Sequence, residues 1–256
     1  MKQRLDQALT ARSLTPTRSQ AESWIKLGRV QVNGHVVTKP GFFVDDTALL
    51  NLSAPERYVS RAGLKLASVV NKFGVQFQGK IVLDVGSSTG GFTDYALQHG
   101  ATRVYAVDVG TDQLHPSLRK DTRIELHEKT DIRNVEIRGQ GKPPRQGVVE
   151  IDACPDIVVI DVSFVSLRQI LPSVVRLSKV DTMIMAMVKP QFEASALQVG
   201  SSGVRKNDRV RREILKSFEQ WAKQSFVIVD KADSEVKGAH GNQERFYLLT
   251  PLKSFQ

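Results

Sequence analysis

What this sequence has little of narrows the possibilities first. It holds one cysteine, Cys154, among 256 residues, which excludes an intrachain disulfide and a cluster of thiolate metal ligands. The longest clean apolar run, residues 183–188, is far too short to cross a bilayer. The first residues include no apolar stretch of the kind that secretory signals contain. We therefore expect a cytoplasmic protein, in a reducing compartment, with no stable insertion into a membrane.

Metal-binding patterns are also missing. The five histidines, at positions 35, 99, 115, 127 and 240, show no spacing typical of metal ligands. We expect no metal site and treat the histidines as structural or surface residues.

Positive charge, in contrast, is abundant. Lysine and arginine number 36 against 27 aspartates and glutamates, which leaves a formal net charge of +9. A balance of this sign favours a polyanionic partner, either nucleic acid or an anionic membrane surface. The hydrophobic content of 41% is enough for an ordinary soluble core. A basic but otherwise ordinary enzyme remains an alternative at this point.

The N-terminal segment has its own pattern. Residues 5–9 have apolar side chains at helical spacing, and Thr17 with Gln20 forms a capping box that opens a second helix. Gly28 is placed to end that helix. Asn33-Gly34 between short apolar pairs predicts a hairpin with a type I′ turn. We expect a small α+β domain over residues 1–53, followed by a linker over residues 54–60.

Four polar residues each follow a short apolar run in the rest of the chain. They are Asp84, Asp108, Asp161 and Lys189. Short apolar runs separated by segments of helix length predict buried parallel strands, so residues 61–256 read as an α/β domain. Ligands of such sheets bind beyond the carboxyl ends of the strands. We expect the four side chains to meet in one crevice that serves as an active site.

Several other segments complete the expected domain. Helices are expected over residues 60–73, 166–177 and 210–222, and closing strands over residues 226–229 and 245–249. A glycine-rich stretch, residues 237–241, would join the two strands, and residues 138–145 read as a basic loop.

A glycine-rich loop follows the first of these strands and precedes a helix. Its candidate cofactor-binding residues are Asp84, Gly86, Ser87, Ser88, Gly90 and Gly91. Glycine lets a backbone approach a ligand closely, and a helix N-terminus offers free amides. The spacing is not that of dinucleotide-binding loops, and the loop lacks the lysine of phosphate-transfer loops.

Two further carboxylates are candidates for the same cofactor. Asp108 ends the next strand, where a carboxylate binds a ribose diol. Asp131, after the expected third strand, could accept from an adenine amino group, although an isolated aspartate is more often a capping residue.

Asp161 and Lys189 form the expected chemical core. A lysine held beside a carboxylate and near a second cation can take or guide a proton. Lys65, at the border of its helix's apolar stripe, is a candidate for that cation, and Glu244 lies in an apolar row of a closing strand. Taken singly, Lys65 and Glu244 would more often be structural or solvated residues.

The first fifty residues resemble the S4 RNA-binding domain. The matching stretches are residues 4–6, 17–21, 25–28, 30–34 and 39–40. The resemblance implies that Arg4, Arg18, Lys26 and Arg29 face RNA phosphates. The alternative is that each of them only solvates a helix face.

Nearly the whole chain resembles the TlyA family, whose members are also called haemolysin A. The matching stretches are residues 58–66, 83–94, 113–116, 161–164, 188–193 and 241–244. The family joins an S4 domain to an FtsJ-like ribose methyltransferase with a Rossmann-like, mostly parallel sheet and an antiparallel closing strand. The resemblance implies S-adenosylmethionine as cofactor, 2′-O-methylation of a cytidine ribose, and ribosomal RNA or a ribosomal subunit as partner. It also implies a catalytic tetrad of Lys65, Asp161, Lys189 and Glu244.

Two other functions remain open. One is a non-catalytic RNA-binding or ribosome-assembly factor, against which the intact tetrad argues. The other is a haemolysin or cytolysin, for which neither a spanning segment nor a strongly amphipathic basic helix is present in the sequence. An assay of methyl transfer and a test on liposomes would discriminate among the three.

Overall fold

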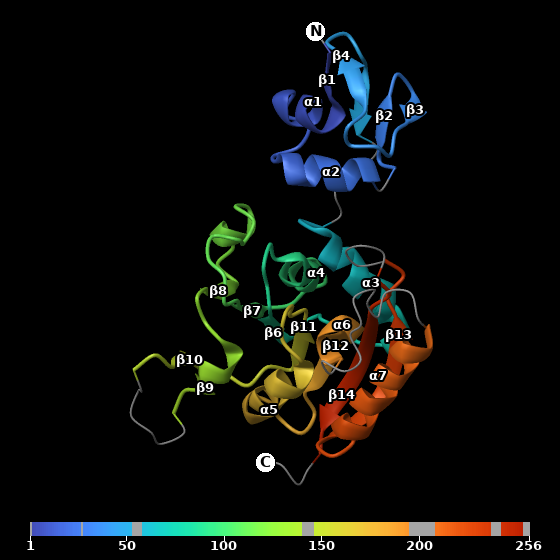
Figure 1. Cartoon of the computed structure of the whole chain (residues 1–256). Coiled ribbons are helices and arrows are strands. Elements are labelled where there is room, and N and C mark those ends of the chain that lie inside the picture. The colour runs from blue at the N-terminus through green and yellow to red at the C-terminus, as the bar shows by residue number, and fades with distance from the viewer. Residues whose placement is uncertain are drawn as a thin grey trace. The chain divides into compact units, whose positions relative to one another are not determined.

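The chain forms two compact units. The computed structural model describes residues 2–26, 28–52, 58–139, 146–194, 208–236 and 242–252. One unit spans Met1–Glu56 and the other spans Arg57–Gln256. Each unit has a hydrophobic core of its own, with one cluster in the smaller unit and two in the larger. Figure 1 shows both units with their elements labelled.

The smaller unit packs two helices against two small antiparallel sheets, β1–β4 and β3–β2–β5. Its elements are β1 (Lys2–Arg4), α1 (Leu5–Ala11), α2 (Arg18–Lys26), β2 (Val30–Val32), β3 (His35–Val36), β4 (Phe43–Asp45) and β5 (Leu50–Leu52). Half of the expected capping box is present: the Thr17 hydroxyl accepts from the Gln20 amide at 3.3 Å, whereas Gln20 Oε1 has no partner among the described residues. The hairpin turn is also confirmed, with φ of 50° at Asn33 and 83° at Gly34.

A buried carboxylate holds the smaller unit together. Asp6 is fully buried and accepts hydrogen bonds from the Arg4 guanidinium at 3.0 and 2.9 Å and from Arg18 Nε at 2.9 Å. These bonds, with the Arg4 bond the largest cause, lower the pKa of Asp6 to about 2. The carboxylate therefore stays ionised and joins the first strand to the second helix.

The larger unit is built on a seven-stranded sheet with the strand order β13-β14-β12-β11-β6-β7-β8. Its helices and strands are α3 (Arg61–Phe73), β6 (Ile81–Val85), α4 (Gly91–Gln98), β7 (Arg103–Val107), β8 (Ile124–His127), β9 (Val135–Ile137), β10 (Val149–Ile151), β11 (Ile157–Ile160), α5 (Leu167–Leu177), β12 (Met183–Val188), α6 (Pro190–Glu193), α7 (Asp208–Ala222), β13 (Phe226–Asp233) and β14 (Arg245–Pro251). Five neighbouring strands are parallel, and β14 closes the sheet antiparallel to β12. The expected mostly parallel α/β fold is thus confirmed.

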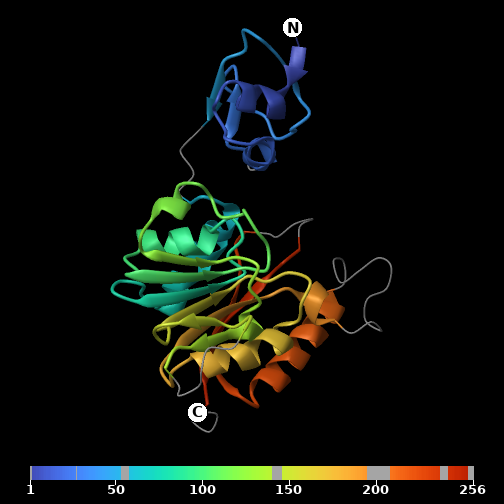
Figure 2. The ribbon, with the colours of Figure 1, turned by 90° about the vertical axis from the view of Figure 1, so that its left-hand side faces the viewer.

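Helices cover both faces of this sheet (Figure 2). Residues of α3 and α4 share one core cluster with one face of the sheet, and residues of α5 and α7 share the other cluster with the opposite face. The central strands are consequently buried on both sides, which explains their continuous apolar runs.

Strand register brings the polar residues to one edge. Ile160 of β11 pairs with Val85 of β6 and with Ala186 of β12, and Val188 of β12 pairs with Arg245 of β14. The residues that follow β6, β11 and β12, and the residue that precedes β14, therefore lie at the same end of the sheet.

Most of the expected helices and strands are present, with shifted ends. The helix α3 follows Ser60 and ends at Gly74, whose φ is 64°, and the Ser166 hydroxyl caps α5. The strands β13 and β14 are longer than expected, because each continues beyond its apolar run. Residues 237–241, and residues 140–145 of the expected basic loop, lie outside the described residues.

Two strands of the larger unit were not anticipated from the sequence, and neither were β1, β4 and β5 of the smaller unit. Strands β9 and β10 form a small parallel sheet of their own, and each has only the three residues Val-Glu-Ile. Three residues are too few to establish an alternating pattern.

Across the described ranges, no helix combines the length and the apolar character needed to cross a membrane.

Candidate active site

Two buried ion pairs lie at the carboxyl edge of the sheet. Lys189 Nζ is 2.6 Å from Asp161 Oδ1, and Lys65 Nζ is 2.6 Å from Glu244 Oε2. None of the four side chains is more than 16% exposed. Charges removed from water to this degree are costly unless paired, so each partner stabilises the other's ionised form.

Strand register places these two pairs next to each other. Lys189 directly follows Val188, and Glu244 directly precedes Arg245, which is the partner of Val188 across the strands. Lys65 reaches Glu244 from α3. The structure therefore gathers all four side chains of the expected tetrad at one edge, although they come from four separate elements.

Ser163 is a contact of the lysine that sequence reasoning missed. Lys189 Nζ donates to the Ser163 hydroxyl at 2.8 Å, in addition to its ion pair with Asp161. An ammonium has three protons to donate, so one remains for a further acceptor after these two partners. The signal for this contact that the sequence offered was the position of Ser163, two residues after Asp161.

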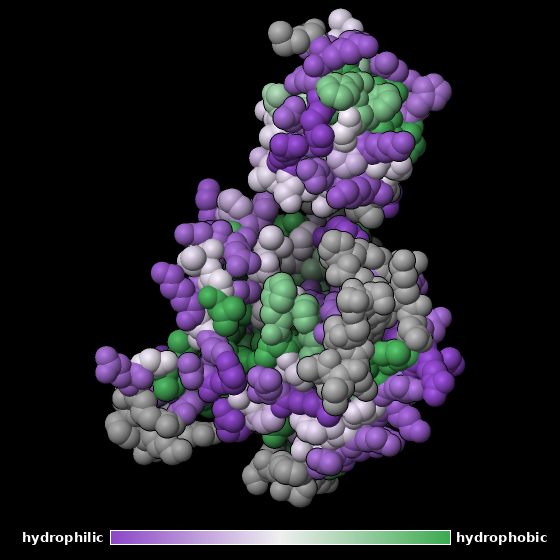
Figure 3. All heavy atoms as spheres, in the orientation of Figure 1, coloured by the Kyte–Doolittle hydropathy of each residue, from purple (hydrophilic) through white to green (hydrophobic). Residues whose placement is uncertain are grey.

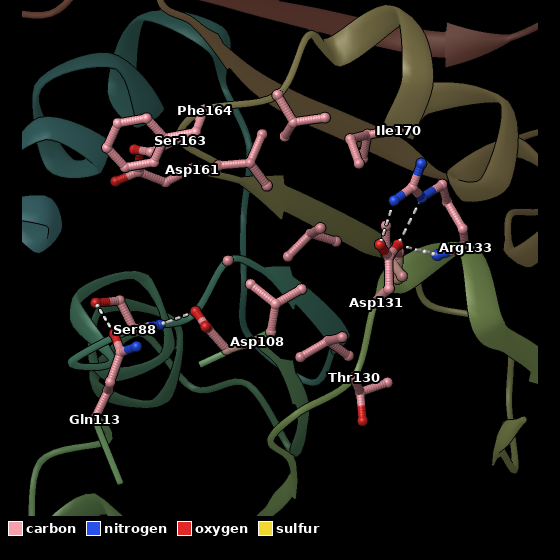
Figure 4. Close-up of a pocket in the computed structure, with 17 residues that line it drawn as sticks. Ser88, Asp108, Gln113, Thr130, Asp131, Arg133, Asp161, Ser163, Phe164 and Ile170 are labelled. Carbon is pink, nitrogen blue, oxygen red and sulfur yellow. Dashed lines mark hydrogen bonds and ion pairs between the residues drawn. The ribbon is translucent and has the colours of Figure 1, made fainter. Parts of the chain in front are cut away.

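A cavity of about 440 Å³ opens beside Asp161 (Figure 4). Its walls combine apolar side chains such as Val85, Val107 and Ile132 with the carboxylates of Asp108, Asp131 and Asp161. A volume of this size and a mostly apolar lining with a few polar groups are typical of cofactor sites.

Asp108 is held firmly at the rim of this cavity. Its carboxylate oxygens accept from the Ser88 amide at 2.8 Å and from the Gly110 amide at 2.6 Å. A carboxylate has about four acceptor sites, so two remain for a ligand. Gln113 accepts from the Ser88 hydroxyl at 2.9 Å, which fixes the same rim.

The glycines of the loop serve different purposes. Gly86 has φ of 83°, and a Cβ there would lie 2.7 Å from the Asp161 carbonyl oxygen, so only glycine fits this lining position. Gly90 and Gly91 line neither this cavity nor the smaller one described next. A Cβ on Gly91 would lie 2.3 Å from the Ser60 hydroxyl oxygen, so Gly91 allows α4 to approach the start of α3.

Asp84 lies beneath the loop. It is fully buried, and its Oδ2 accepts from the amide of Thr93 at 3.0 Å and from the hydroxyl of Thr93 at 2.7 Å. Together with Ser87 and Lys189 it lines a second, smaller cavity of about 160 Å³. Burial raises the pKa of Asp84 to about 7, and the charge of Asp161 adds to the rise.

Asp131 both lines the large cavity and caps a short helix. Its carboxylate accepts from the backbone amide of Arg133 at 2.9 Å, at the start of the 3₁₀-helix Ile132–Asn134, and pairs with the Arg133 guanidinium. This pairing lowers the pKa of Asp131. Both interpretations that the sequence left open, ligand contact and capping, are compatible with this position.

Two aromatic side chains beside the ion pair were also missed. Phe164 is 92% exposed and has φ of 65°, a backbone conformation that bulky residues rarely adopt. Its ring centroid lies 5.2 Å from that of Phe192. Each phenylalanine stands three residues after a member of the pair, Asp161 or Lys189, and this repeated spacing was the signal available. Figure 3 shows apolar side chains, in green, exposed near the centre of the larger unit.

Comparison with known families agrees with this geometry. The model of the FtsJ-like methyltransferases matches residues 58–250. The chain belongs to the FtsJ-like methyltransferase family. The model of the S4 domain matches residues 3–49, within the smaller unit.

Several relatives align with nearly the full length of the chain. The 16S/23S rRNA (cytidine-2′-O)-methyltransferase TlyA of Mycobacterium tuberculosis is 36% identical over 96% of this chain and 89% of its own. The YqxC protein of Bacillus subtilis is 40% identical over 95% of this chain and 84% of its own. The solved structure of a haemolysin-named protein from Streptococcus thermophilus superposes with a TM-score of 0.73 at 36% identity, over 98% of this chain and 89% of that one. Membership of the TlyA group of FtsJ-like methyltransferases follows.

The basic residues expected to face RNA are placed unequally. Arg4 and Arg18 are both bound to the buried Asp6, while the Arg18 side chain is still 51% exposed. Lys26 lies 3.8 Å from Glu22, which is also within 3.9 Å of Arg18. Arg29 lies three residues after Lys26 along the chain.

Within the described ranges, no group of three metal-ligating side chains could hold a metal ion, and a metal-free site stays a prediction.

The raised pKa of Asp84 predicts a pH-dependent stability. Between the ordinary carboxyl value of 3.8 and about 7, the folded protein keeps a proton that the unfolded chain has lost. The free energy of unfolding should therefore fall as the pH rises through this interval, with a limiting slope of about 1.4 kcal/mol per pH unit, and should level off above it. Asp84→Asn should lack this contribution.

Urea unfolding of both proteins from pH 4 to pH 8 measures the difference. The exposed Asp181→Asn is the matched control, because it removes a carboxylate without touching the site. Parallel curves for Asp84→Asn and the unaltered chain would show that Asp84 does not titrate in this range.

Proposed function

We propose that this chain transfers a methyl group from S-adenosylmethionine to the ribose 2′-hydroxyl of a cytidine in ribosomal RNA. One observation carries the proposal: Lys189, bound by Asp161 and Ser163, lies at the carboxyl edge of the sheet beside a cavity fit for a cofactor. The name of the Mycobacterium tuberculosis relative supports the choice of cytidine and of ribosomal RNA.

The cavities suit S-adenosylmethionine. Apolar walls fit an adenine ring, and the free acceptor sites of Asp108 fit the ribose hydroxyls of the cofactor. In the smaller cavity, Asp84 Oδ1 and Ser87 Oγ are buried without a hydrogen-bond partner among the described residues. These two oxygens suit the ammonium group of the methionine part. The bound cofactor supplies a methyl group already activated by the positive charge on sulfur.

The protein's own contribution is to place and activate the hydroxyl. The remaining proton of the Lys189 ammonium can hold the 2′-oxygen, while Asp161 and Ser163 fix the direction of the side chain. As the oxygen attacks, the Lys189 ammonium passes one proton to the Asp161 carboxylate and takes up the hydroxyl proton in its place, so that the proton lost by the hydroxyl stays within the pair. Positioning for in-line transfer should supply most of the rate enhancement, and proton transfer typically adds about 10²–10⁴-fold. The Lys65–Glu244 pair fixes the charge around the ribose.

The smaller unit supplies affinity for RNA. Its S4 domain match and its basic α2 favour contact with phosphates. Because Arg4 and Arg18 also hold Asp6, their replacement would disturb the fold together with any RNA contact. Lys26, whose side chain is 62% exposed, is the cleaner position for a test.

Replacement of Lys189 tests the reaction itself. Lys189→Ala should abolish methyl transfer while affinity for S-adenosylmethionine stays within a few fold, and Lys189→Arg should fail too, because arginine keeps its proton. The measurement is ribose methylation mapped along ribosomal RNA. The RNA comes from cells in which the gene has been deleted and then supplied again, either unaltered or with one of the substitutions.

The exposed Lys179→Ala is the control for loss of a lysine on the same unit. Methylation near the normal level with Lys189→Ala would refute the assigned role. Absence of methylation with the unaltered chain would favour a non-catalytic RNA-binding protein. Leakage from liposomes caused by the purified protein would favour the haemolysin alternative.

Replacement of Asp108 tests the cofactor site. Asp108→Ala should weaken binding of S-adenosylmethionine by about 1–3 kcal/mol, the scale for unpairing buried hydrogen bonds. Calorimetry measures the affinity, and Asp112→Ala is the control, since that side chain is 89% exposed and lines neither cavity. Equal affinities for the two variants would remove Asp108 from the site.

Removal of the smaller unit tests its role. A chain of residues 57–256 should fold, because the core of the larger unit is separate, and should still bind S-adenosylmethionine. Its RNA affinity should fall, and each lost phosphate contact should reduce the slope of log affinity against log salt by roughly 0.7–0.9. Lys26→Glu in the full chain should act in the same direction, more weakly.

RNA binding across a salt series measures both effects. Identical slopes for the full and shortened chains would mean that the smaller unit does not touch the RNA backbone.

A further inference from the structure

A third cavity adjoins the cofactor cavity on the side of the ion pair. It measures about 520 Å³, and its lining includes Phe164, Phe192, Arg168, Gln169 and Glu193. Phe164 and Val165 line both this cavity and the cofactor cavity, so the two adjoin at that point. The mechanism proposed above makes no use of this third cavity.

The wall of the third cavity is tied to the catalytic residues. Glu193, whose side chain is only 1% exposed, accepts from the Ser166 hydroxyl at 2.7 Å and from the Leu167 amide at 2.6 Å. These bonds join the loop that follows Asp161 to the short helix that follows Lys189. The position of the cavity relative to the ion pair is therefore set by hydrogen bonds rather than by loop length alone.

The lining offers an aromatic surface and an available amide. The rings of Phe164 and Phe192 are tilted by 50° and form one side. Arg168 is engaged, since it donates to the Ser217 hydroxyl at 2.9 Å and lies 3.6 Å from Glu193. The carboxamide of Gln169 is exposed and has no hydrogen-bond partner among the described residues. A carboxamide presents a donor and an acceptor side by side, as the edge of a nucleobase does.

We propose that this third cavity is the subsite for the base of the nucleotide being methylated. The base leaves the RNA stack, lies against Phe192 on the aromatic side, and presents its polar edge to the Gln169 carboxamide. Single-stranded RNA is read in this way elsewhere, by stacking on aromatic side chains and by hydrogen bonds to the edge of an unstacked base. The inference rests on the proposed function, because the base placed here is the one attached to the ribose that is methylated.

The geometry of a nucleotide requires a subsite for the base next to the site of the ribose. The base and the 2′-hydroxyl are carried by adjacent carbons of one sugar, so a base subsite has to adjoin the place where the hydroxyl is held. The third cavity meets this condition, because Phe192 donates its amide to the Lys189 carbonyl at 2.9 Å and Phe164 is on the loop of Asp161. Other polymers with a reactive hydroxyl would leave the aromatic side without a partner.

The test pairs protein variants with altered RNA. Two ribosomal RNA fragments carry either the normal cytidine or an abasic ribose with its 2′-hydroxyl at the mapped target. Gln169→Ala and Phe192→Ala should each lower kcat/KM on the cytidine RNA about tenfold, the scale of one lost hydrogen bond or stacking contact. On the abasic RNA, which methylates slowly with any variant, the same substitutions should cost less than twofold.

Controls separate a base contact from a structural role. Gln224→Ala removes another exposed glutamine of the larger unit and should change neither substrate. Calorimetric binding of S-adenosylmethionine should be unchanged in all three variants. Phe192→Leu, which keeps an apolar group without a ring face, should behave as Phe192→Ala does.

Two outcomes would overturn the inference. Equal losses on both RNAs would mean that Gln169 and Phe192 act on the fold or on the ion pair and not on a base. No loss on either RNA would mean that the base lies elsewhere. Failure of the unaltered chain to methylate the cytidine RNA would instead refute the proposed function, and the subsite with it.

Discussion

The ion pair between Lys189 and Asp161 is the constraint around which the larger unit is organised. Both side chains are largely buried, so they have to be presented at the right distance by elements that do not move apart. The parallel pairing of β11 with β12 meets this need, because the two residues follow directly from neighbouring strands. Ser163 and Glu193 then fix the segments that continue from those strands.

A buried carboxyl group lies beneath the glycine-rich loop that follows β6. Asp84 binds Thr93 at the start of α4, and Gly86 leaves space for the carbonyl of Asp161. Loop, helix and ion pair thus share one set of contacts, and the cavities of about 440 and 160 Å³ form beside them. Burial raises the pKa of Asp84 to about 7, and we therefore expect the stability of this region to depend on pH.

The smaller unit follows a related principle on a smaller scale. Asp6 is buried and orients two guanidinium groups at once, so a fold with few apolar residues gains a charged centre. The same arrangement leaves Arg18 half exposed, and a side chain held in one direction loses less conformational freedom when it meets a phosphate. These arginines have a structural role in addition to the RNA contact expected of them, which accounts for the difficulty of assigning them from the sequence alone.

The sequence by itself determined the fold class and indicated which residues form the candidate site. Apolar runs ending at Asp84, Asp108, Asp161 and Lys189 predicted parallel strands and a common edge, because period and strand polarity are local properties of the chain. Tertiary structure decided the rest. The residues alone made Lys65 and Glu244 weak candidates, and packing of α3 against the closing strands placed them 2.6 Å apart. Packing against Leu118 and Ser60 requires glycine at Gly90 and Gly91, whose contact with a cofactor stays a prediction. Contacts between elements far apart in the chain leave no local period, so the aromatic pair of Phe164 and Phe192 emerged only when the loop after β11 met α6 in space.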